Sequence, residues 1–287
     1  MKMKSFFTLS FMLLILLNLT AQENKRNFKI HTVAFYNLEN LFDTINDVNK
    51  NDEASPIMEI RFNRGKIYSE KISNMAEVVS QIGFDVTKRP PSILGICEVE
   101  NRTVVEDLIS DEKLRKYNYG IVHYESPDDR GIDVGLIYNK DVFKVKNSSS
   151  HDVFITGNNS SKRRNTRDQL VVSGYLDGEL MHFIVNHWPS RGADETKRIA
   201  AAEVNNFIID SLRNKYESPK IITMGDFNDD PFDKSIKKIL GAKKNISDVK
   251  INDLYNPFET ILVDEGVGSN AYSCLLYTSD AADESSS

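Results

Sequence analysis

The chain contains 287 residues, of which 40% are hydrophobic and 27% are charged, and it has only 2 cysteines. This composition provides enough apolar side chains for a core and excludes collagen-like, disordered and disulfide-stapled proteins. The 36 basic and 42 acidic side chains give a formal net charge of −6, so the molecule as a whole does not attract polyanions at long range. A phosphate-containing partner would therefore need a local binding device.

Residues 1–21 have the pattern of a secretory signal peptide. Lys2 and Lys4 precede an apolar stretch from Phe6 to Leu19, and small residues follow up to Ala21. The alternative is an uncleaved membrane anchor, but the apolar stretch is shorter than the ~20 residues that a spanning helix needs. We therefore expect cleavage near Ala21, export to the periplasm or the medium, and no stable membrane anchor afterwards.

After this segment we predict one α/β domain over residues 28–272, because no linker and no repeat of fixed period interrupts it. Asp177 and Gly178 separate two apolar runs and suit a tight hairpin, so at least one strand pair should be antiparallel. Runs rich in Val, Ile, Phe and Tyr predict strands over residues 29–36, 92–99, 132–138, 170–176, 181–188 and 220–224.

Three segments between these strands predict helices. In residues 66–82 apolar side chains recur at spacings of four and three, and Gly83 supplies a C-terminal stop. Residues 193–212 repeat this pattern, and residues 103–117 follow it less regularly. Helices with one apolar stripe beside strands of mixed direction favour a layered α/β sandwich.

Several apolar strands end in polar residues that are capable of chemistry. The strand ends of one sheet lie close together, so residues far apart in the sequence can converge there. Carboxylates, carboxamides and one histidine suit a hard cation such as Mg²⁺, Mn²⁺ or Ca²⁺ and do not suit structural zinc. The residues in question are Asn37, Glu39, Glu98, Glu100, Asn186, His187, Asp226 and Asn228.

Five short motifs follow one another along the chain: FYNLENLFD (35–43), GICEVEN (95–101), RGIDV (130–134), NHWPSR (186–191) and GDFND (225–229). In this order they resemble the motifs of the endonuclease/exonuclease/phosphatase family. One such motif alone is weak evidence, whereas five in the family's order are strong evidence. The resemblance implies a DNase I-like four-layer αββα sandwich with two mixed sheets, and divalent-metal hydrolysis of phosphoester bonds.

The resemblance also implies roles for individual residues. Glu98 resembles the family's metal-binding glutamate, with Asn37 beside it in the site. His187 resembles the histidine that bonds the scissile phosphate. Asp226 resembles the aspartate that orients or deprotonates the attacking water, and Asn228 the residue beside it that contacts the phosphate. The expected substrate-binding residues are Arg167, Arg191 and Asn186.

These roles agree with the chemistry of in-line attack on a phosphodiester, which needs an activated water and neutralisation of charge on the phosphate. A cation held by Glu98 can polarise the phosphate and stabilise the leaving oxygen. Asp226 can accept a proton from the water. His187, if neighbouring carboxylates hold it protonated, can donate to a non-bridging oxygen.

Other residues have a plain structural alternative. Glu39 and Glu100 either support the site or lie on the surface, and Asp229 and Asp230 are expected in a solvated turn. The basic segment 160–167, SSKRRNTR, is either a loop that grips a phosphate backbone or a solvated connection. We expect Cys97 to be buried and no native disulfide to form. His31, His123 and His151 stand in no recognisable pattern.

The sequence departs from the family at its C-terminal end. The family closes with a strand that carries an Asp-His pair, and this chain has no histidine after His187. Residues 273–287 resemble translated adapter or vector sequence joined to a truncated gene, the alternative being a natural disordered tail. We therefore expect the last strand or strands to be missing, and the 287-residue chain to be inactive or badly impaired and marginally stable.

These observations favour an exported, monomeric, divalent-metal-dependent phosphodiesterase, most simply a nuclease that hydrolyses DNA or RNA. Two alternatives stay open. One is a phospholipid or sugar-phosphate phosphodiesterase with the same fold, and the other is an exported binding protein without catalytic activity.

Overall fold

The computed structural model describes residues 28–157, 160–164, 166–268, 270–272 and 275–277. Residues 1–31 and 32–287 form separate units, and the fold described below is that of the second unit. The predicted signal peptide, residues 1–21, lies outside the described residues. Within the described part of the chain, no helix combines the length and the apolar character needed to cross a bilayer.

The first sheet has the strand order β1-β2-β4-β3. β1 and β2 are parallel, whereas the other two pairings are antiparallel. Every residue of β2 is buried, because this central strand is covered on both faces. The strands are β1 (Val33–Leu41), β2 (Ile93–Val99), β3 (Tyr119–His123) and β4 (Asp133–Asn139).

The second sheet has the order β10-β9-β8-β5, with β10 parallel to β9 and the remaining pairs antiparallel. The predicted hairpin is confirmed between β8 and β9, where Asp177 and Gly178 take φ values of 48° and 90°. The strands are β5 (Phe143–His151), β8 (Gln169–Leu176), β9 (Glu179–His187) and β10 (Lys220–Asp226). Two short ribbons pair β6 (Ile155–Gly157) with β7 (Ser160–Arg164), and β11 (Asn270–Tyr272) with β12 (Leu275–Tyr277).

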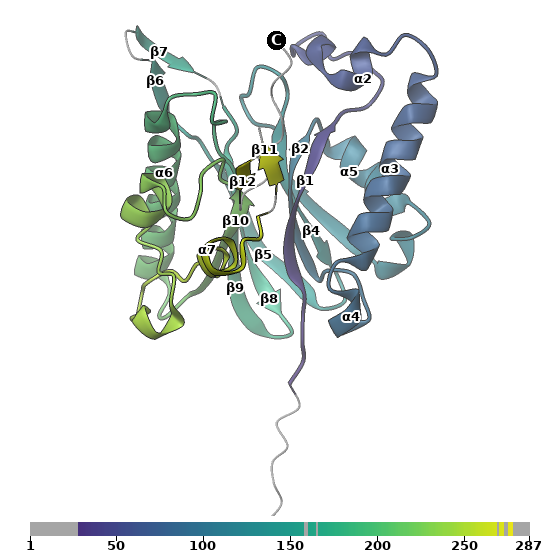
Figure 1. Cartoon of the computed structure of the whole chain (residues 1–287). Helices are drawn as coiled ribbons and strands as arrows, with labels where there is room; N and C mark the ends of the chain where they lie inside the picture. Colours follow the sequence, from purple (N-terminus) through teal and green to yellow (C-terminus); the bar gives the residue numbers. More distant parts are fainter. Residues whose placement is uncertain (1–27, 158–159, 165, 269, 273–274, 278–287) are drawn as a thin grey trace, which may run out of the picture. The chain divides into compact units, whose positions relative to one another are not determined.

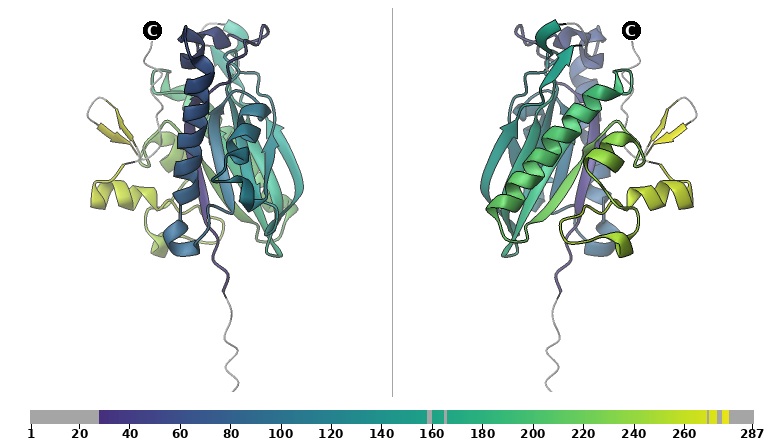
Figure 2. Two further views of the ribbon diagram at one scale, coloured as in Figure 1. Left: turned by 90° about the vertical axis from the view of Figure 1, so that its right-hand side faces the viewer. Right: turned by 90° about the vertical axis from the view of Figure 1, so that its left-hand side faces the viewer.

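Within residues 32–287 the three longest helices lie on the outer faces of the two sheets. Figures 1 and 2 show α3 (Arg64–Gln81) and α5 (Arg102–Ser110) beside the first sheet, and α6 (Glu195–Lys215) beside the second. The shorter helical segments are η1 (Asp52–Ala54), α2 (Pro56–Glu59), α4 (Phe84–Thr87), η2 (Arg115–Tyr117), η3 (Ser235–Ile239), η4 (Ile246–Asp248) and α7 (Phe258–Glu265).

Three apolar clusters hold these layers together. Phe143 and Phe183 pack edge to face in the cluster between the two sheets, with ring centroids 5.6 Å apart. A second cluster joins the first sheet to α3 and α5, and a third joins the second sheet to α6. The predicted four-layer αββα sandwich with two mixed sheets is therefore confirmed.

The boundaries differ from the predicted ones where polar residues continue a strand. β1 runs on to Leu41, through residues that the sequence pattern assigned to a polar strand end. β5 was not predicted because its second half is Asn-Ser-Ser-Ser-His, a composition that looks like a loop but forms an edge strand. The pattern also predicted no strand after residue 272, yet β12 pairs with β11.

Cys97 is buried, as expected, and Cys274 lies outside the described residues.

Gly225 permits the close approach of β10 to β9, and we predict that Gly225→Ala destabilises the protein by about 3 kcal/mol or more. At its φ of 154°, an added Cβ would lie 2.2 Å from the carbonyl oxygen of Asn186. Gly65→Ala is the control, because a Cβ there meets nothing within 4 Å and alanine favours the helix. Urea denaturation of both variants measures the difference, and equal stabilities would contradict the argument.

A second prediction concerns the pH dependence of folding stability and is based on His182. It is fully buried on β9, with its Nδ1 2.7 Å from the Ser173 hydroxyl, and burial followed by the charges of Lys146 and Lys215 lowers its pKa. As the pH falls, the unfolded chain therefore takes up this proton before the folded one, so folding stability decreases below about pH 6.5. His182→Gln should lose less stability than the wild type between pH 7.5 and pH 5.5 in denaturant titrations. Parallel losses would contradict the prediction.

Candidate active site

The candidate site lies where the parallel strand pairs of the two sheets end. Asn37 is on β1 and Glu98 on β2, while His187 and Asp226 are the last residues of β9 and β10 and pair with each other in register. Because both pairs are parallel, their carboxyl ends bring these four side chains together. The structure thus assembles the four residues from four strands, at positions up to 189 apart in the sequence.

The Asn37 amide connects the two carboxylates of the site. Its Nδ2 donates to Glu98 Oε1 at 2.9 Å and to Asp226 Oδ2 at 3.4 Å. Backbone amides hold the other oxygens, since Asn40 donates to Glu98 Oε2 at 2.9 Å and Asn228 donates to Asp226 Oδ1 at 2.9 Å. All of these carboxylate and amide side chains except that of Asn40 are at most 2% exposed. The positions of the carboxylates are therefore fixed before any ligand binds.

His187 faces both carboxylates from the second sheet. Its Nε2 lies 3.6 Å from Glu98 Oε1 and 4.0 Å from Asp226 Oδ2. Burial, together with the guanidinium groups of Arg167 and Arg130, nevertheless holds the pKa of His187 well below its usual range. This direction is opposite to the protonated form that the sequence considered for His187, and burial is its largest cause. A neutral imidazole still offers one N–H donor.

The ligand atoms of Glu98, His187 and Asp226 all lie within 4.8 Å of one another. Two buried carboxylates this close repel each other and need a compensating positive charge. His187 Nδ1 has no hydrogen-bond partner among the described residues, although metal-bound histidines normally use their second nitrogen. The two oxygen donors and one nitrogen donor fit a divalent cation, as the sequence predicted.

The backbone around the site is strained. Glu39, Asn40, Glu98 and Asn228 have φ values between 49° and 57°, a region that residues other than glycine seldom adopt. Such strain is typical of functional sites, where the surrounding structure maintains it. Lys71 on α3 helps here, because its Nζ donates to the backbone carbonyls of Glu39 and Asn40. No pattern in the sequence distinguishes Lys71 from the other charged residues of this helix.

The carbonyl of Trp188 connects the site to Arg167. It accepts from Arg167 Nη2 at 2.8 Å and from Asn228 Nδ2 at 3.0 Å, while the Trp188 N–H donates to the Asp226 carbonyl at 2.8 Å. Arg167 is 5% exposed and also contacts Asp128. The structure therefore places Arg167 beside the site, where the sequence predicted it.

Asn186, which was expected to bind substrate, is instead surrounded by groups of the protein itself. Its amide donates to the Met224 carbonyl and to the Thr223 hydroxyl, each at 3.0 Å. Its Oδ1 accepts from Trp188 Nε1 and from Asn205 on α6. The side chain is fully buried and its polar atoms are used inside the protein, so it joins β9, β10 and α6 rather than facing a substrate.

Arg191 also has carboxylate partners inside the protein. Its Nη2 lies 2.8 Å from Asp230 and 2.9 Å from Asp233. The expectation of a solvated turn at Asp229 and Asp230 is wrong, since they are 3% and 8% exposed. Arg198 on α6 holds Asp229 at 2.5 Å. The turn is buried because Arg191 and Arg198 pack onto it and pair with its carboxylates.

Among the remaining candidates, Glu39 is exposed and Glu100 is buried. Glu100 accepts from the Asp43 backbone, and burial, with Asp43 close by, raises its pKa to about 7. The structure also joins His123 to Asp133, with Nε2 and Oδ2 3.0 Å apart, although the sequence showed no pattern at His123. In the basic segment 160–167, the side chains of Lys162, Arg163 and Arg164 lie outside the described part.

The sequence model of the Endonuclease/Exonuclease/phosphatase family matches residues 32–281. The chain belongs to this family. A search of curated proteins gives no match. The family assignment establishes a phosphoric-ester hydrolase fold around the site, and the carboxylate and histidine groups of this family member could hold a metal ion.

Solved structures resemble this family member at low identity. Truncated Caenorhabditis elegans TDP2 is 19% identical with a TM-score of 0.41, covering 56% of this chain and 55% of that chain. The human Nocturnin catalytic domain with bound sulfate is 17% identical with a TM-score of 0.42, covering 58% and 63%. ANGEL2, described as a 2′,3′-cyclic phosphatase, is 15% identical with a TM-score of 0.48, covering 77% and 59%. The chain spans about half the length of the C. elegans TDP2 chains that it matches.

Because the cluster fits a divalent cation, we predict that Mg²⁺ or Mn²⁺ raises the melting temperature of the protein and that Glu98→Gln removes most of this shift. Ion at a hundredfold excess over its Kd stabilises a folded protein by about 2.7 kcal/mol. Glu112→Gln is the matched control, because Glu112 is exposed after α5, away from the strand ends of the site. Differential scanning calorimetry with EDTA and with each ion measures the shift. A shift that Glu98→Gln leaves intact would place the ion elsewhere.

Proposed function

We propose that this family member is a divalent-metal-dependent phosphodiesterase that cleaves nucleic acid, with Mg²⁺ or Mn²⁺ as the ion and Ca²⁺ as an alternative. One observation carries the proposal: Glu98, His187 and Asp226 converge at the joined strand ends with mutual distances that suit one cation. The family membership supplies the reaction class, hydrolysis of a phosphoric ester.

Each side chain of the site has a geometry that suits one part of the reaction. Asp226, held by Asn37 and by the Asn228 backbone, presents Oδ2 as an acceptor that can orient a water and take its proton. His187 in its neutral form can donate one hydrogen bond to a phosphate oxygen. A cation held by Glu98 would supply Lewis-acid neutralisation of the phosphate charge.

Arg167 and Asn228 would hold the phosphate from the second sheet. Both donate to the Trp188 carbonyl, so they share one anchor beside His187. Arg167 is almost fully buried, and a guanidinium in a poorly solvated position binds phosphate more strongly than one in bulk water. We assign no substrate contact to Asn186 or Arg191, because the amide of Asn186 bonds to its neighbours inside the protein and Arg191 Nη2 lies between the carboxylates of Asp230 and Asp233.

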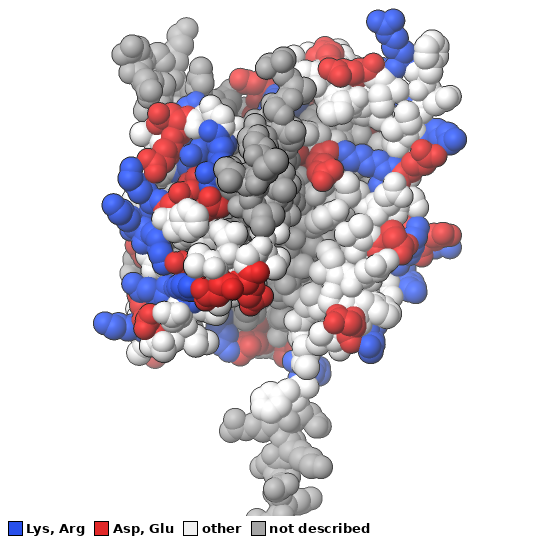
Figure 3. Space-filling model, viewed as in Figure 1, with Lys and Arg blue, Asp and Glu red and all other residues white. Residues whose placement is uncertain are grey.

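A nucleic-acid substrate is compatible with this site, because the positive charge needed to bind it is confined to the neighbourhood of the site. On the face drawn in Figure 3, acidic and basic side chains are interspersed, with no single-sign field across it. Binding would therefore depend on the cation and on the few arginines next to the strand ends. The alternatives that stay open are a phospholipid or sugar-phosphate phosphodiesterase and a binding protein without activity.

We also propose that the 287-residue chain has lower catalytic activity than intact members of the family. The sequence holds five histidines, and none follows His187. The motifs resemble those of a family whose last strand completes the catalytic centre with an Asp-His pair, and the histidine of that pair has no counterpart after His187 in this sequence. Added imidazole can replace a missing histidine side chain if the space for it is open, and it should then raise the rate.

Export is also a proposal, and it depends on the pattern of residues 1–21. Expression of the full chain with its first 21 residues, followed by N-terminal sequencing of the product, tests whether cleavage occurs near Ala21. We further propose that the protein acts as a monomer, which sedimentation measures directly.

We predict slow, metal-dependent nicking of plasmid DNA, or cleavage of RNA, that stops on chelation. Glu98→Gln and His187→Ala should lower the rate at least about a hundredfold, because each removes stabilisation of the charged transition state. Glu112→Gln should keep the wild-type rate, and imidazole should increase it.

Two outcomes would contradict this. If DNA, RNA and a small phosphodiester all stay intact with Mg²⁺ or Mn²⁺, with and without imidazole, the proposed function fails. If the rate equals that of intact family members and does not respond to imidazole, the proposed impairment fails.

A further inference from the structure

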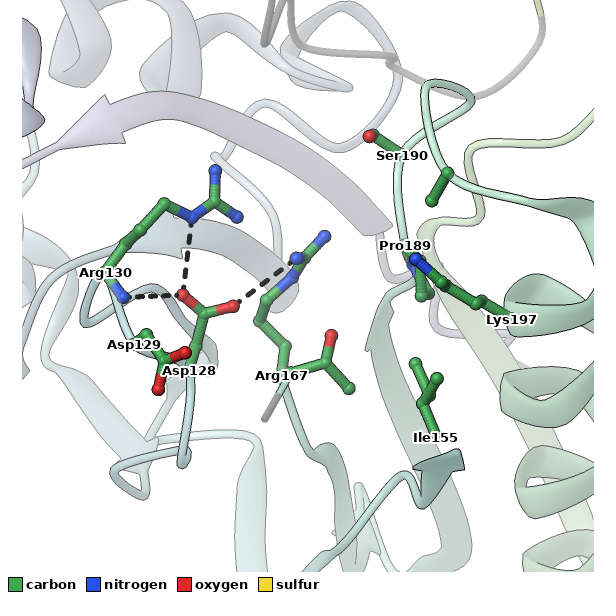
Figure 4. A pocket seen from close by; sticks show the side chains of 10 residues that line it. Asp128, Asp129, Arg130, Ile155, Arg167, Pro189, Ser190 and Lys197 are labelled. Atoms are coloured by element: carbon green, nitrogen blue, oxygen red, sulfur yellow. Dashed lines mark hydrogen bonds and ion pairs between the residues drawn. The ribbon is translucent and has the colours of Figure 1, made fainter. Parts of the chain in front are cut away.

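A pocket of about 280 Å³ lies beside the candidate active site (Figure 4). Three cationic side chains line it, those of Arg130, Arg167 and Lys197, together with Asp128 and Ser190. Its volume is slightly below that of pockets for drug-sized ligands, which suits a phosphate group with part of the attached sugar. Neither the catalytic arrangement nor the five motifs account for Lys197.

The pocket continues from the catalytic cluster along one short stretch of chain. His187 belongs to the cluster, the Trp188 carbonyl binds Arg167, and Ser190 lines the pocket. Three residues extend over at most about 11 Å, so the pocket wall is close to His187. A ligand of modest size could therefore contact both places at once.

Asp128 lies between Arg130 and Arg167 and forms an ion pair with each of them. Its Oδ2 lies 3.5 Å from Arg167 Nη1, and its Oδ1 lies 3.4 Å from Arg130 Nε. Figure 4 shows the two guanidinium groups on either side of this carboxylate, and Lys197 reaching from α6 across the space toward Arg167. Arg167 Nε, on a side chain that is 5% exposed, has no hydrogen-bond partner among the described residues.

One carboxylate therefore orients two guanidinium groups, and Lys197 adds a third positive charge. Forked guanidinium groups match the oxygens of a phosphate, and a lysine adds a point charge. Asp129 also lines the pocket and is exposed, so water screens it. The charge that the pocket offers to a ligand is consequently positive.

We propose that this pocket binds a second phosphate of the substrate through Arg130 and Lys197, with Arg167 lying between this phosphate and the one that is hydrolysed. The inference rests on the proposed function and deepens it. The preferred substrates are then nucleotide chains, in which phosphates lie on both sides of each sugar. Diesters with a single phosphate lack the group that the pocket recognises.

The test uses the full chain and measures binding rather than turnover. Thymidine 3′,5′-bisphosphate is titrated in Mg²⁺ buffer against thymidine 5′-monophosphate and thymidine 3′-monophosphate. The fluorescence of Trp188 reports binding, because it is the one tryptophan of the sequence and its carbonyl binds Arg167. The bisphosphate should bind at least about tenfold more tightly than either monophosphate, as expected for added charge-assisted hydrogen bonds.

Arg130→Ala and Lys197→Ala should each remove most of this tenfold gain. Both side chains are partly exposed, so the variants should fold, and thermal melts verify this. Lys66→Ala is the matched control, since Lys66 is exposed on α3 and pairs only with its neighbour Glu70 among the ion pairs of the described residues. This variant should keep the full gain.

A bisphosphate that binds no more tightly than the better monophosphate overturns the inference, and so does a gain that Arg130→Ala and Lys197→Ala leave intact. The outcome is separable from that of the proposed function. A protein that shows the gain but cleaves no phosphodiester refutes the function alone, whereas one that cleaves diesters without the gain refutes the second phosphate site alone.

Discussion

The two sheets bring a pair of carboxylates, Glu98 and Asp226, together in a place that excludes water. Both are almost fully buried, and one amide group, that of Asn37, donates to each of them. Two like charges in a poorly solvated site are unfavourable by several kcal/mol unless a positive charge compensates them. The protein supplies neutral donors here and places its arginines farther out. The arrangement therefore favours a cation, and the neutral His187 does not compete for that role.

The rest of the fold can be understood as support for this pair. Parallel pairing of β1 with β2 and of β9 with β10 points four strand ends at one place. The buried ion pair between Arg198 and Asp229 ties α6 to the turn after β10, and the Arg198 guanidinium also donates to the carbonyls of Ser190 and Ala193. Breaking such a buried pair leaves an uncompensated charge, so the loop from Ser190 to Ala193 is held firmly against that turn. This loop forms one wall of the pocket beside the site.

Local patterns in the sequence predicted a layered α/β sandwich and the polar residues at the strand ends, whereas the four layers and the residue roles were implied by the resemblance to the family. Apolar runs locate the central strands, and Glu98, His187 and Asp226 come directly at their ends. The role of Asn186 was not predictable in this way, because Asn186 and His187 are neighbours in one strand. Successive side chains in a strand point to opposite faces, so one of the two faces the site and the other faces α6. A motif that contains both does not say which is which.

The same reasoning explains the arginines. Arg167 and Arg191 looked alike in the sequence, since each lies in a polar segment next to a strand end. Their roles differ because of what surrounds them in space. Arg191 meets two carboxylates, from Asp230 and Asp233, which balance its charge. Arg167 shares the single carboxylate of Asp128 with Arg130, and its remaining donors point to a carbonyl and into a pocket. The number of carboxylates around each guanidinium group thus decides which arginine has positive charge left to bind a phosphate. That number depends on contacts between segments far apart in the chain.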